Sequence, residues 1–269
     1  QAYLPDSFPL QKELTAWAGE RVKKGGSPVK LRIVKGANME MELFDAAVHG
    51  WMSAPYDNKL DVDANFKRMV DYGMDPENIK AVQLGIASHN LFELAYAFNL
   101  AKQNNVSEYF YFEMLEGMAD HIRRAIQETT GDILLYAPVA AKDQFINAIG
   151  YLIRRLDENT AKDNFLRYAC NLKTGSKEWT FLMEQFIASL HHKDKAGTSP
   201  RRIQNRISDS FAQISCTFIK NEFSNEPDTD WALFPNRKWA EEIKIRWEKK
   251  DGTNPEKIPL VTAGEEIFA

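Results

Sequence analysis

The chain has few cysteines and no long hydrophobic run. Only Cys170 and Cys216 occur among its 269 residues, and they lack the spacing of a zinc site or a redox pair. No apolar stretch reaches the roughly 18 residues of a transmembrane helix. These absences exclude a disulfide framework, a cysteine-based metal site and a membrane-spanning segment, and they favour a cytoplasmic protein whose thiols stay reduced.

An excess of positive charge is also absent. Lys and Arg total 34 against 38 Asp and Glu, which leaves a net charge of −4. Because nucleic-acid binding requires a basic surface, the composition argues against a nucleic-acid partner. The N-terminus carries neither an initiator methionine nor a signal-peptide pattern, and this predicts that the chain begins inside a larger protein.

Four short apolar runs, rich in β-branched and aromatic residues, predict buried parallel strands. They are Val29–Lys35, Ile79–Ser88, Glu108–Leu115 and Asp132–Val139. Helical periodicity alternates with them at Leu10–Lys24, Met39–His49, Asp63–Tyr72, Asn90–Gln103, Met118–Thr129 and Lys142–Asn159. This alternation is typical of an α/β fold. Four such units are half of an eight-stranded barrel, so the residues leave open a part of a barrel, a half that pairs with another half, or an open doubly wound sheet.

The pattern changes after Asn159. Glu178–His191 predicts one more amphipathic helix, and the polar stretch 193–227 predicts a linker. A helix at Asn236–Lys249 and an apolar run at Ile258–Thr262 then begin a further structure that the chain does not complete.

One predicted helix carries an unusual cluster of polar side chains. Tyr151, Arg154, Arg155 and Glu158 share one face, whereas the apolar residues of the segment form another. Two adjacent guanidiniums repel each other, and a pocket that holds both favours an anion such as a carboxylate. The alternative, favoured by spacing alone, is a solvated charged face with an Arg–Glu pair.

The ends of the predicted strands are the second place where chemistry is expected, because ligands of parallel sheets bind there. Lys35-Gly36-Ala37 suits a phosphate or equally a plain turn, since glycine permits close approach of the backbone. Ser88-His89-Asn90 places three hydrogen-bonding side chains at the next strand end. Leu115 ends the third run, and Tyr136 in the fourth is suited to stacking on a ring or to the core.

Four motifs together resemble the proline dehydrogenase family in order and spacing. They are LRIVKGANMEME at Leu31–Glu42, ASHN at Ala87–Asn90, LLYAPV at Leu134–Val139 and YLIRRLDEN at Tyr151–Asn159. SPRRIQNR at Ser199–Arg206 and NEPDTDWALFPNRKWAEEI at Asn225–Ile243 resemble the connection to the second module of the bifunctional proline utilization A family. The resemblance implies a (βα)8 flavin barrel of which the chain carries strands five to eight and helix eight. It divides the chain into barrel (1–168), helix and linker (169–224) and the start of an aldehyde dehydrogenase module (225–269).

The resemblance also assigns roles to individual residues. Arg154 and Arg155 are expected to hold the carboxylate of L-proline, with Glu158 in the same network. Tyr136, Tyr151 and Leu115 are expected to wall the proline ring. The expected FAD contacts are Gln1, Arg32, Val34, Lys35, Gly36, Ala37, Lys59, Ser88, His89, Asn90 and Phe165, with Arg32 near the reacting N5 edge. Asn38-Met39 replaces an aromatic pair of some members, and the family's Lys and Asp from earlier strands have no counterpart here.

The implied reaction is FAD-dependent oxidation of L-proline to Δ1-pyrroline-5-carboxylate, by hydride transfer from ring carbon C5 to flavin N5. Implied partners are a quinone at the membrane surface and the remainder of a bifunctional polypeptide, whose second module uses NAD at a site outside this chain. An oligomer is compatible with this, no metal is expected, and the chain alone is expected to be inactive. The alternatives are a non-catalytic barrel piece or interaction module, and a metal-free barrel enzyme that binds a phosphorylated substrate.

Overall fold

The computed structural model describes residues 1–202, 227–248 and 259–268, without the side chains of residues 157, 158, 259–262 and 266–268. The chain divides into two compact units. The larger unit comprises residues 1–47 and 52–202, and the smaller comprises residues 48–51 and 203–269. The larger unit contains every residue with an expected role in binding.

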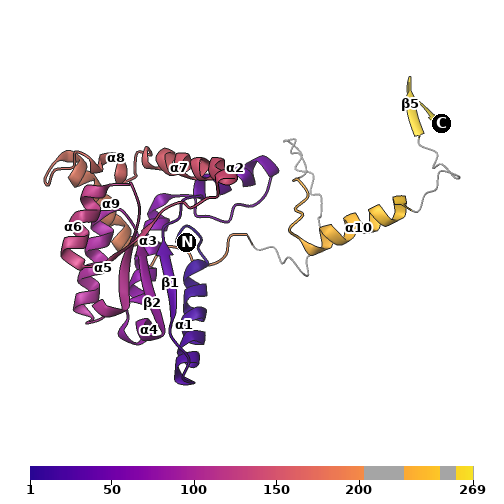
Figure 1. Ribbon diagram of the computed structural model, residues 1–269. Helices are drawn as coiled ribbons and strands as arrows, with labels where there is room; N and C mark the ends of the chain where they lie inside the picture. Colours follow the sequence, from indigo (N-terminus) through magenta and orange to yellow (C-terminus); the bar gives the residue numbers. More distant parts are fainter. Residues whose placement is uncertain (203–226, 249–258, 269) are drawn as a thin grey trace. The chain divides into compact units, whose positions relative to one another are not determined.

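A parallel four-stranded sheet forms the centre of the larger unit (Figure 1). Its strands are β1 (Val29–Val34), β2 (Val82–Ala87), β3 (Phe110–Leu115) and β4 (Ile133–Tyr136). They lie in chain order, so each strand pairs with the next along the sequence. Parallel strands that lie in chain order, with helices between them, form βα repeats. The prediction of an α/β fold with a parallel sheet is confirmed.

Nine α-helices of the described chain surround or follow this sheet. They are α1 (Ser7–Lys23), α2 (Met39–His49), α3 (Lys59–Gly73), α4 (Pro76–Ala81), α5 (Leu91–Gln103), α6 (Asp120–Thr130), α7 (Phe145–Asn159), α8 (Leu166–Ala169) and α9 (Lys177–His192). Eight lie within the larger unit, and the last two residues of α2 belong to the smaller unit. Two 3-10 turns, η1 (Ser107–Tyr109) and η2 (Lys142–Gln144), precede β3 and α7. Side-chain caps mark several starts: Asn58, Asn90 and Ser176 each accept a backbone N–H of the helix that follows.

The main core lies between one face of the sheet and the helices that cover it. Ile33, Leu84, Ile86 and Phe112 project from three strands and are fully or almost fully buried, together with Phe66 of α3. Alternation along a strand then places Arg32, Gly85 and Glu113 on the opposite face. One face of the sheet therefore builds stability, and the other is available for a site.

Two predicted strands start earlier than the observed ones. Residues 79–81 belong to α4, because Asp75 caps a short helix with Pro76 in its first turn. Glu108 and Tyr109 form part of η1 rather than β3. In both cases an apolar run continues across a helix–strand junction, and hydrophobicity alone does not mark the boundary.

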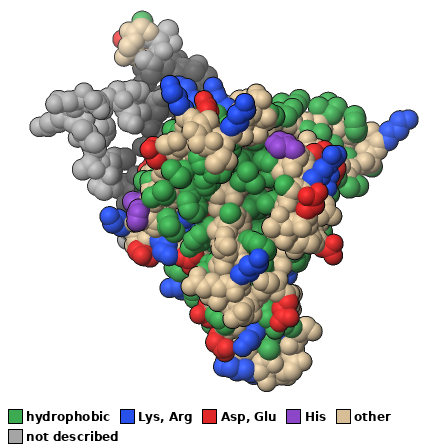
Figure 2. Space-filling view, turned by 90° about the vertical axis from the view of Figure 1, so that its left-hand side faces the viewer, with side chains coloured by type: hydrophobic (Ala, Val, Ile, Leu, Met, Phe, Trp, Pro, Cys, Tyr) green, Lys and Arg blue, Asp and Glu red, His purple; other side chains and the backbone are tan. Residues whose placement is uncertain are grey.

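Hydrophobic side chains remain exposed on the larger unit, and half of the large ones lie on α7 and β4. Figure 2 shows such side chains gathered in the middle of one face of the molecule, with charged side chains around them. The exposed apolar residues of β4, α7 and the segment between them are Leu134, Leu135, Tyr136, Val139, Phe145, Ile146, Ile149, Leu152, Ile153 and Leu156. The apolar face predicted for the helix that carries Arg154 and Arg155 is thus present on α7, and no described residue buries it.

The smaller unit contains α10 (Phe234–Glu248) and a hairpin of β5 (Pro259–Thr262) with β6 (Glu265–Phe268). Its start is held by the indole of Trp51, which donates to the carbonyl of Asp228. Trp231 and Trp239 stack with ring centroids 6.5 Å apart. Most of the predicted linker 193–227, and Cys216 with it, lies outside the described residues.

Candidate functional site

A cavity of about 570 Å³ lies where the four strands end. Figure 1 shows α2, α7 and α8 at this end of the sheet. The cavity is lined by the strand ends, by α2 and α7 and by the segment before α8. A volume of this size is typical of small-molecule sites, and the carboxyl ends of parallel strands are where such sites occur.

Most of the residues predicted from the sequence meet in this one cavity. The lining includes Arg32, Val34, Lys35, Gly36, Ala37, Lys59, Ser88, His89, Asn90, Leu115, Tyr136, Tyr151, Arg154, Arg155 and Phe165. Gln1 is not part of the lining, although its side-chain oxygen lies beside Gly36. The side chain of Glu158 lies outside the described part of the structure.

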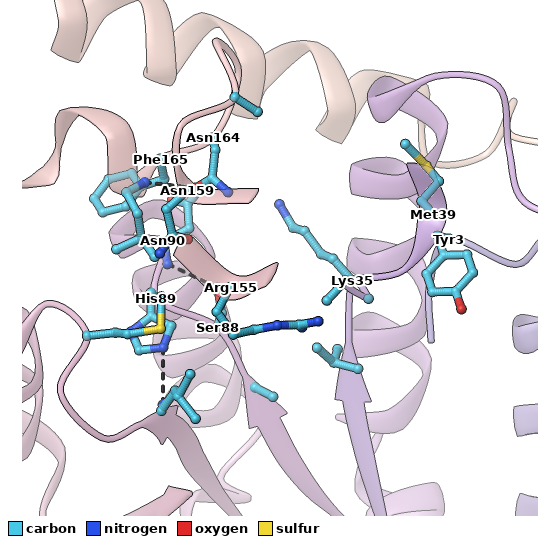
Figure 3. A pocket seen from close by; sticks show the side chains of 18 of the residues that line it. Tyr3, Lys35, Met39, Ser88, His89, Asn90, Arg155, Asn159, Asn164 and Phe165 are labelled. Carbon is cyan, nitrogen blue, oxygen red and sulfur yellow. Dashed lines mark hydrogen bonds between the residues drawn. The ribbon is translucent and has the colours of Figure 1, made fainter. Parts of the chain in front are cut away.

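The two arginines of α7 line the cavity rather than an isolated solvent face. Arg154 donates to the sulfur of Met41 on α2, at 3.7 Å, and the guanidinium of Arg155 lies 5.0 Å from the ring centroid of Tyr151. Figure 3 shows Arg155 and Lys35 pointing into the cavity from opposite sides. Guanidiniums that border a cavity provide paired donors for an anionic group.

Lys35 is held in a network of buried charges beneath the cavity. Its ammonium lies 2.7 Å from Asp63 and donates to Glu93 at 2.8 Å. Lys59 pairs with Asp63, and the fully buried Lys67 donates to Glu93 at 2.7 Å. The network therefore contains three ammonium groups and two carboxylates, and Lys35 meets the cavity with its charge largely compensated.

Burial and charge act in opposite directions on the pKa values of this network. Burial alone would raise the pKa of Asp63, but Lys35 and Lys59 outweigh it and lower the pKa to about 2. Burial would lower the pKa of Lys35, but Asp63 and Glu93 raise it instead. Burial does lower the pKa of Lys67, because the attraction of Glu93 offsets it only in part.

Two features require a glycine at position 36: its positive φ and the close contact with Tyr3. Its φ is +106°, and a Cβ at this position would lie 1.9 Å from Cδ1 of Tyr3. The backbone N–H groups of Ala2 and Tyr3 donate to the carbonyls of Val34 and Lys35. The glycine that the sequence suggests for a phosphate loop thus makes room for the ring of Tyr3.

One ring nitrogen of His89 is hydrogen-bonded to the backbone, and the other is available to a ligand. Its Nε2 accepts the backbone N–H of Leu115 at 3.1 Å (Figure 3), and Nδ1 is buried without a hydrogen-bond partner among the described residues. Because Nε2 accepts, a neutral ring carries its proton on Nδ1. Burial lowers the pKa of His89, which keeps the ring neutral. The cavity thus contains a donor suited to an acceptor on a ligand.

Sequence reasoning assigned no role to three acidic residues at the cavity. Asp63 and Glu113 line the cavity, and Glu93 holds Lys35 from beneath. A charged residue alone within the aromatic run of β3 was the available indication for Glu113. Asp63 and Glu93 had none, because acidic residues on helices are usually exposed.

The fold and the cavity define a class of protein: an α/β protein with βα repeats and a cavity of small-molecule size, lined by both cations and carboxylates, at the carboxyl ends of its strands. No cluster of three or more potential metal ligands occurs within the described residues. In the same part of the chain, no helix combines the length and hydrophobicity needed to cross a membrane.

The model of the proline dehydrogenase family matches residues 1–168. The chain belongs to this family, whose members are oxidoreductases. The bifunctional protein PutA of Escherichia coli is 29% identical over 143 residues, which are 51% of this chain.

Solved structures agree with this assignment. Proline utilization A from Corynebacterium freiburgense superposes with a TM-score of 0.66 at 36% identity over 90% of this chain. The protein of that name from Bdellovibrio bacteriovorus, inactivated by N-propargylglycine, gives 0.64 at 30% identity over 99%. The chain spans only 22% and 24% of these two structures and 10% of the Escherichia coli protein.

Proposed function

We propose that this chain forms the substrate-binding part of an FAD-dependent proline dehydrogenase, which oxidises L-proline to Δ1-pyrroline-5-carboxylate. The observation that carries the proposal is the cavity itself: the adjacent guanidiniums of α7 line the same space as the strand-end residues. A solvated charged face would not require this convergence. Membership of the proline dehydrogenase family supports the substrate.

In the proposed site the substrate is held at both ends. Arg154 and Arg155 bind the carboxylate of proline through charge-assisted hydrogen bonds. Tyr151, Tyr136 and Leu115, which line the same cavity, wall the ring. Glu158 completes the network on α7. Fixing the carboxylate and the ring together orients the reacting carbon, which lowers the entropic part of the barrier.

The residues present fit a flavin. The buried Nδ1–H of His89 has no acceptor within the described part of the chain, and flavins present ring and phosphate oxygens. In the proposed site Arg32, Lys35 and Lys59 are the cationic side chains that contact the flavin. The other holding residues are Gln1, Val34, Gly36, Ala37, Ser88, Asn90 and Phe165. FAD, when bound, supplies the acceptor for the hydride that leaves the proline ring.

We place this chain in the second half of a (βα)8 barrel, with strands β1–β4 as barrel strands five to eight. The exposed apolar residues of β4 and α7 support this, because a lone half-barrel leaves apolar surface and strand edges uncovered. We keep the divisions 1–168, 169–224 and 225–269, with the last as the start of an NAD-dependent glutamate-semialdehyde dehydrogenase module. A quinone at the periphery of the inner membrane is the proposed electron acceptor of this otherwise cytoplasmic enzyme.

Proline-dependent reduction of a dye by the complete, FAD-loaded polypeptide tests the function. We expect Arg154→Met and Arg155→Met each to weaken proline binding by more than tenfold, because each removes a charge-assisted pair. Arg124→Met on α6, which does not line the cavity, is the matched control. An unchanged Michaelis constant for both cavity variants contradicts the carboxylate clamp, and an inert wild type contradicts the function.

A further inference from the structure

The inner face of the sheet carries a carboxylate to which the proposed reaction assigns no role. Glu113 projects from β3 on the face opposite the core, yet its side chain is fully buried. Two cations of β1 reach it: Arg32 Nε donates to Oε2 at 2.7 Å, and Lys30 Nζ lies 2.7 Å from Oε1. A buried carboxylate requires such partners, so the three groups form one unit.

The strand between them is shaped for this contact. β2 separates β1 from β3, and Gly85 lies opposite Arg32 in the register. A Cβ on Gly85 would lie 2.0 Å from Oε1 of Glu113 and 2.9 Å from Cε of Lys30. Only glycine lets the charged side chains meet across the middle strand. The sequence therefore combines a glycine, a carboxylate and two cations on three strands to build one contact.

The contact fixes the direction of Arg32. Its side chain is 45% exposed and would otherwise be mobile, but Nε is bound to Glu113 and the guanidinium lies 4.6 Å from the ring centroid of Tyr136. The bond through Nε does not occupy the two terminal amino groups. Arg32, Glu113 and Tyr136 all line the cavity. Glu113 thus holds a guanidinium between the sheet and a residue expected to wall the substrate.

We propose that Glu113 is a positioning residue: its carboxylate aims Arg32 at the cavity and offsets one of the two positive charges on the inner face of the sheet. This inference rests on the proposed function, in which Arg32 lies near the reacting edge of FAD. A guanidinium held in one orientation needs no reorganisation during the reaction. The carboxylate also moderates the positive field that favours the reduced cofactor.

The test uses the complete, FAD-loaded polypeptide and Glu113→Gln, which keeps the shape and removes the charge. Anaerobic stopped-flow measurements give the limiting rate of flavin reduction and the apparent Kd of proline, and an anaerobic redox titration gives the potential. We expect a rate at least tenfold lower with Kd changed less than threefold. We also expect the reduction equilibrium to shift about tenfold toward reduced flavin, which is about 30 mV for two electrons.

A second variant guards against misfolding. Lys30→Met/Glu113→Gln removes one charge of each sign. The group that loses its charged partner is then Arg32, which is half-exposed rather than buried. We expect it to keep the low rate, because Arg32 is still unanchored, and to return the potential toward that of the wild type. Glu77→Gln, at a carboxylate 85% exposed on α4, is the control and should match the wild type.

The outcomes separate the two proposals. A wild type that reduces the dye with proline, beside Glu113→Gln with unchanged rate and potential, overturns the role of Glu113 and leaves the function intact. A double variant with the wild-type rate, or a loss confined to proline affinity, overturns it as well. A wild type that holds no FAD, or that does not react with proline, overturns the function and this inference together.

Discussion

Replacing Glu93 should test how much the buried charge network contributes to the stability of the site. Its Oε1 accepts from both Lys35 and Lys67, at 2.8 and 2.7 Å. In Glu93→Gln, Lys35 keeps Asp63, but the fully buried Lys67 loses its carboxylate and keeps Ser189, the ring of Phe186 and a neutral amide. Removing one partner of a buried pair costs about 3 to 5 kcal/mol. Because Lys35 remains paired, we expect about 3 kcal/mol.

Lys67→Met should cost less, about 1 to 2 kcal/mol. It removes the buried ammonium whose charged form is already disfavoured, and Glu93 keeps Lys35 as its partner. The double variant Lys67→Met/Glu93→Gln should then be more stable than Glu93→Gln alone. We expect a coupling energy of about 2 kcal/mol, within the range for contacting residues.

Hydrogen exchange of the complete polypeptide, followed by mass spectrometry, measures these changes locally. Peptides from α3 and α5 report the opening free energy of the two helices that supply Lys67 and Glu93. The exposed pair Lys80–Glu77 on α4 is the matched control, and its Gln variant at Glu77 should produce no measurable change. Glu93→Gln within 1 kcal/mol of the wild type, or additive single effects, would refute the reasoning.

Three further predictions follow from the site. Gly36→Ala should lower the free energy of unfolding by at least about 2 kcal/mol, because its Cβ would collide with Tyr3 and its φ is positive. Gly19→Ala in α1 is the control: its Cβ would meet nothing within 4 Å, and it should not destabilise the fold. Urea denaturation of both variants measures the difference. The lowered pKa of Asp63 stabilises the fold above the ordinary value of 3.8, so the advantage of wild type over Asp63→Asn from this source, about 2 kcal/mol, should disappear as the pH falls from 3.8 to 2. Nitrogen chemical shifts of His89 should show a neutral ring protonated at Nδ1 at pH 7, and an Nε2-protonated ring would contradict the hydrogen bond from Leu115.

Local sequence predicted the elements well where the helical periodicity is clear. Met39–His49 is a helix with the predicted bounds, and the helix predicted at Asn90–Gln103 begins one residue later, because Asn90 is its N-cap. The strand starts at Ile79 and Glu108 were wrong, because the apolar runs continue through a short helix and a 3-10 turn. The face of α7 that carries Tyr151 and Arg155 followed from helical spacing alone.

The tertiary structure alone decided which charges meet. Glu113 is 81 positions from Arg32 and 83 from Lys30, and only the parallel register and the missing side chain of Gly85 bring it to these two residues of β1. Lys35 could be identified as a candidate from its place at a strand end, but its compensation by Asp63 and Glu93 depends on how α3 and α5 pack.

The sequence by itself thus determined the α/β alternation, the family and the residues that carry the arginine pair, because these depend on local spacing and composition. Only the tertiary structure decided that the arginines border a cavity, that Gly36 accommodates Tyr3 and that buried carboxylates balance the cations of the site. The physical reason is that a charge can be buried only beside its partner, and partners distant in sequence are set by packing and strand register.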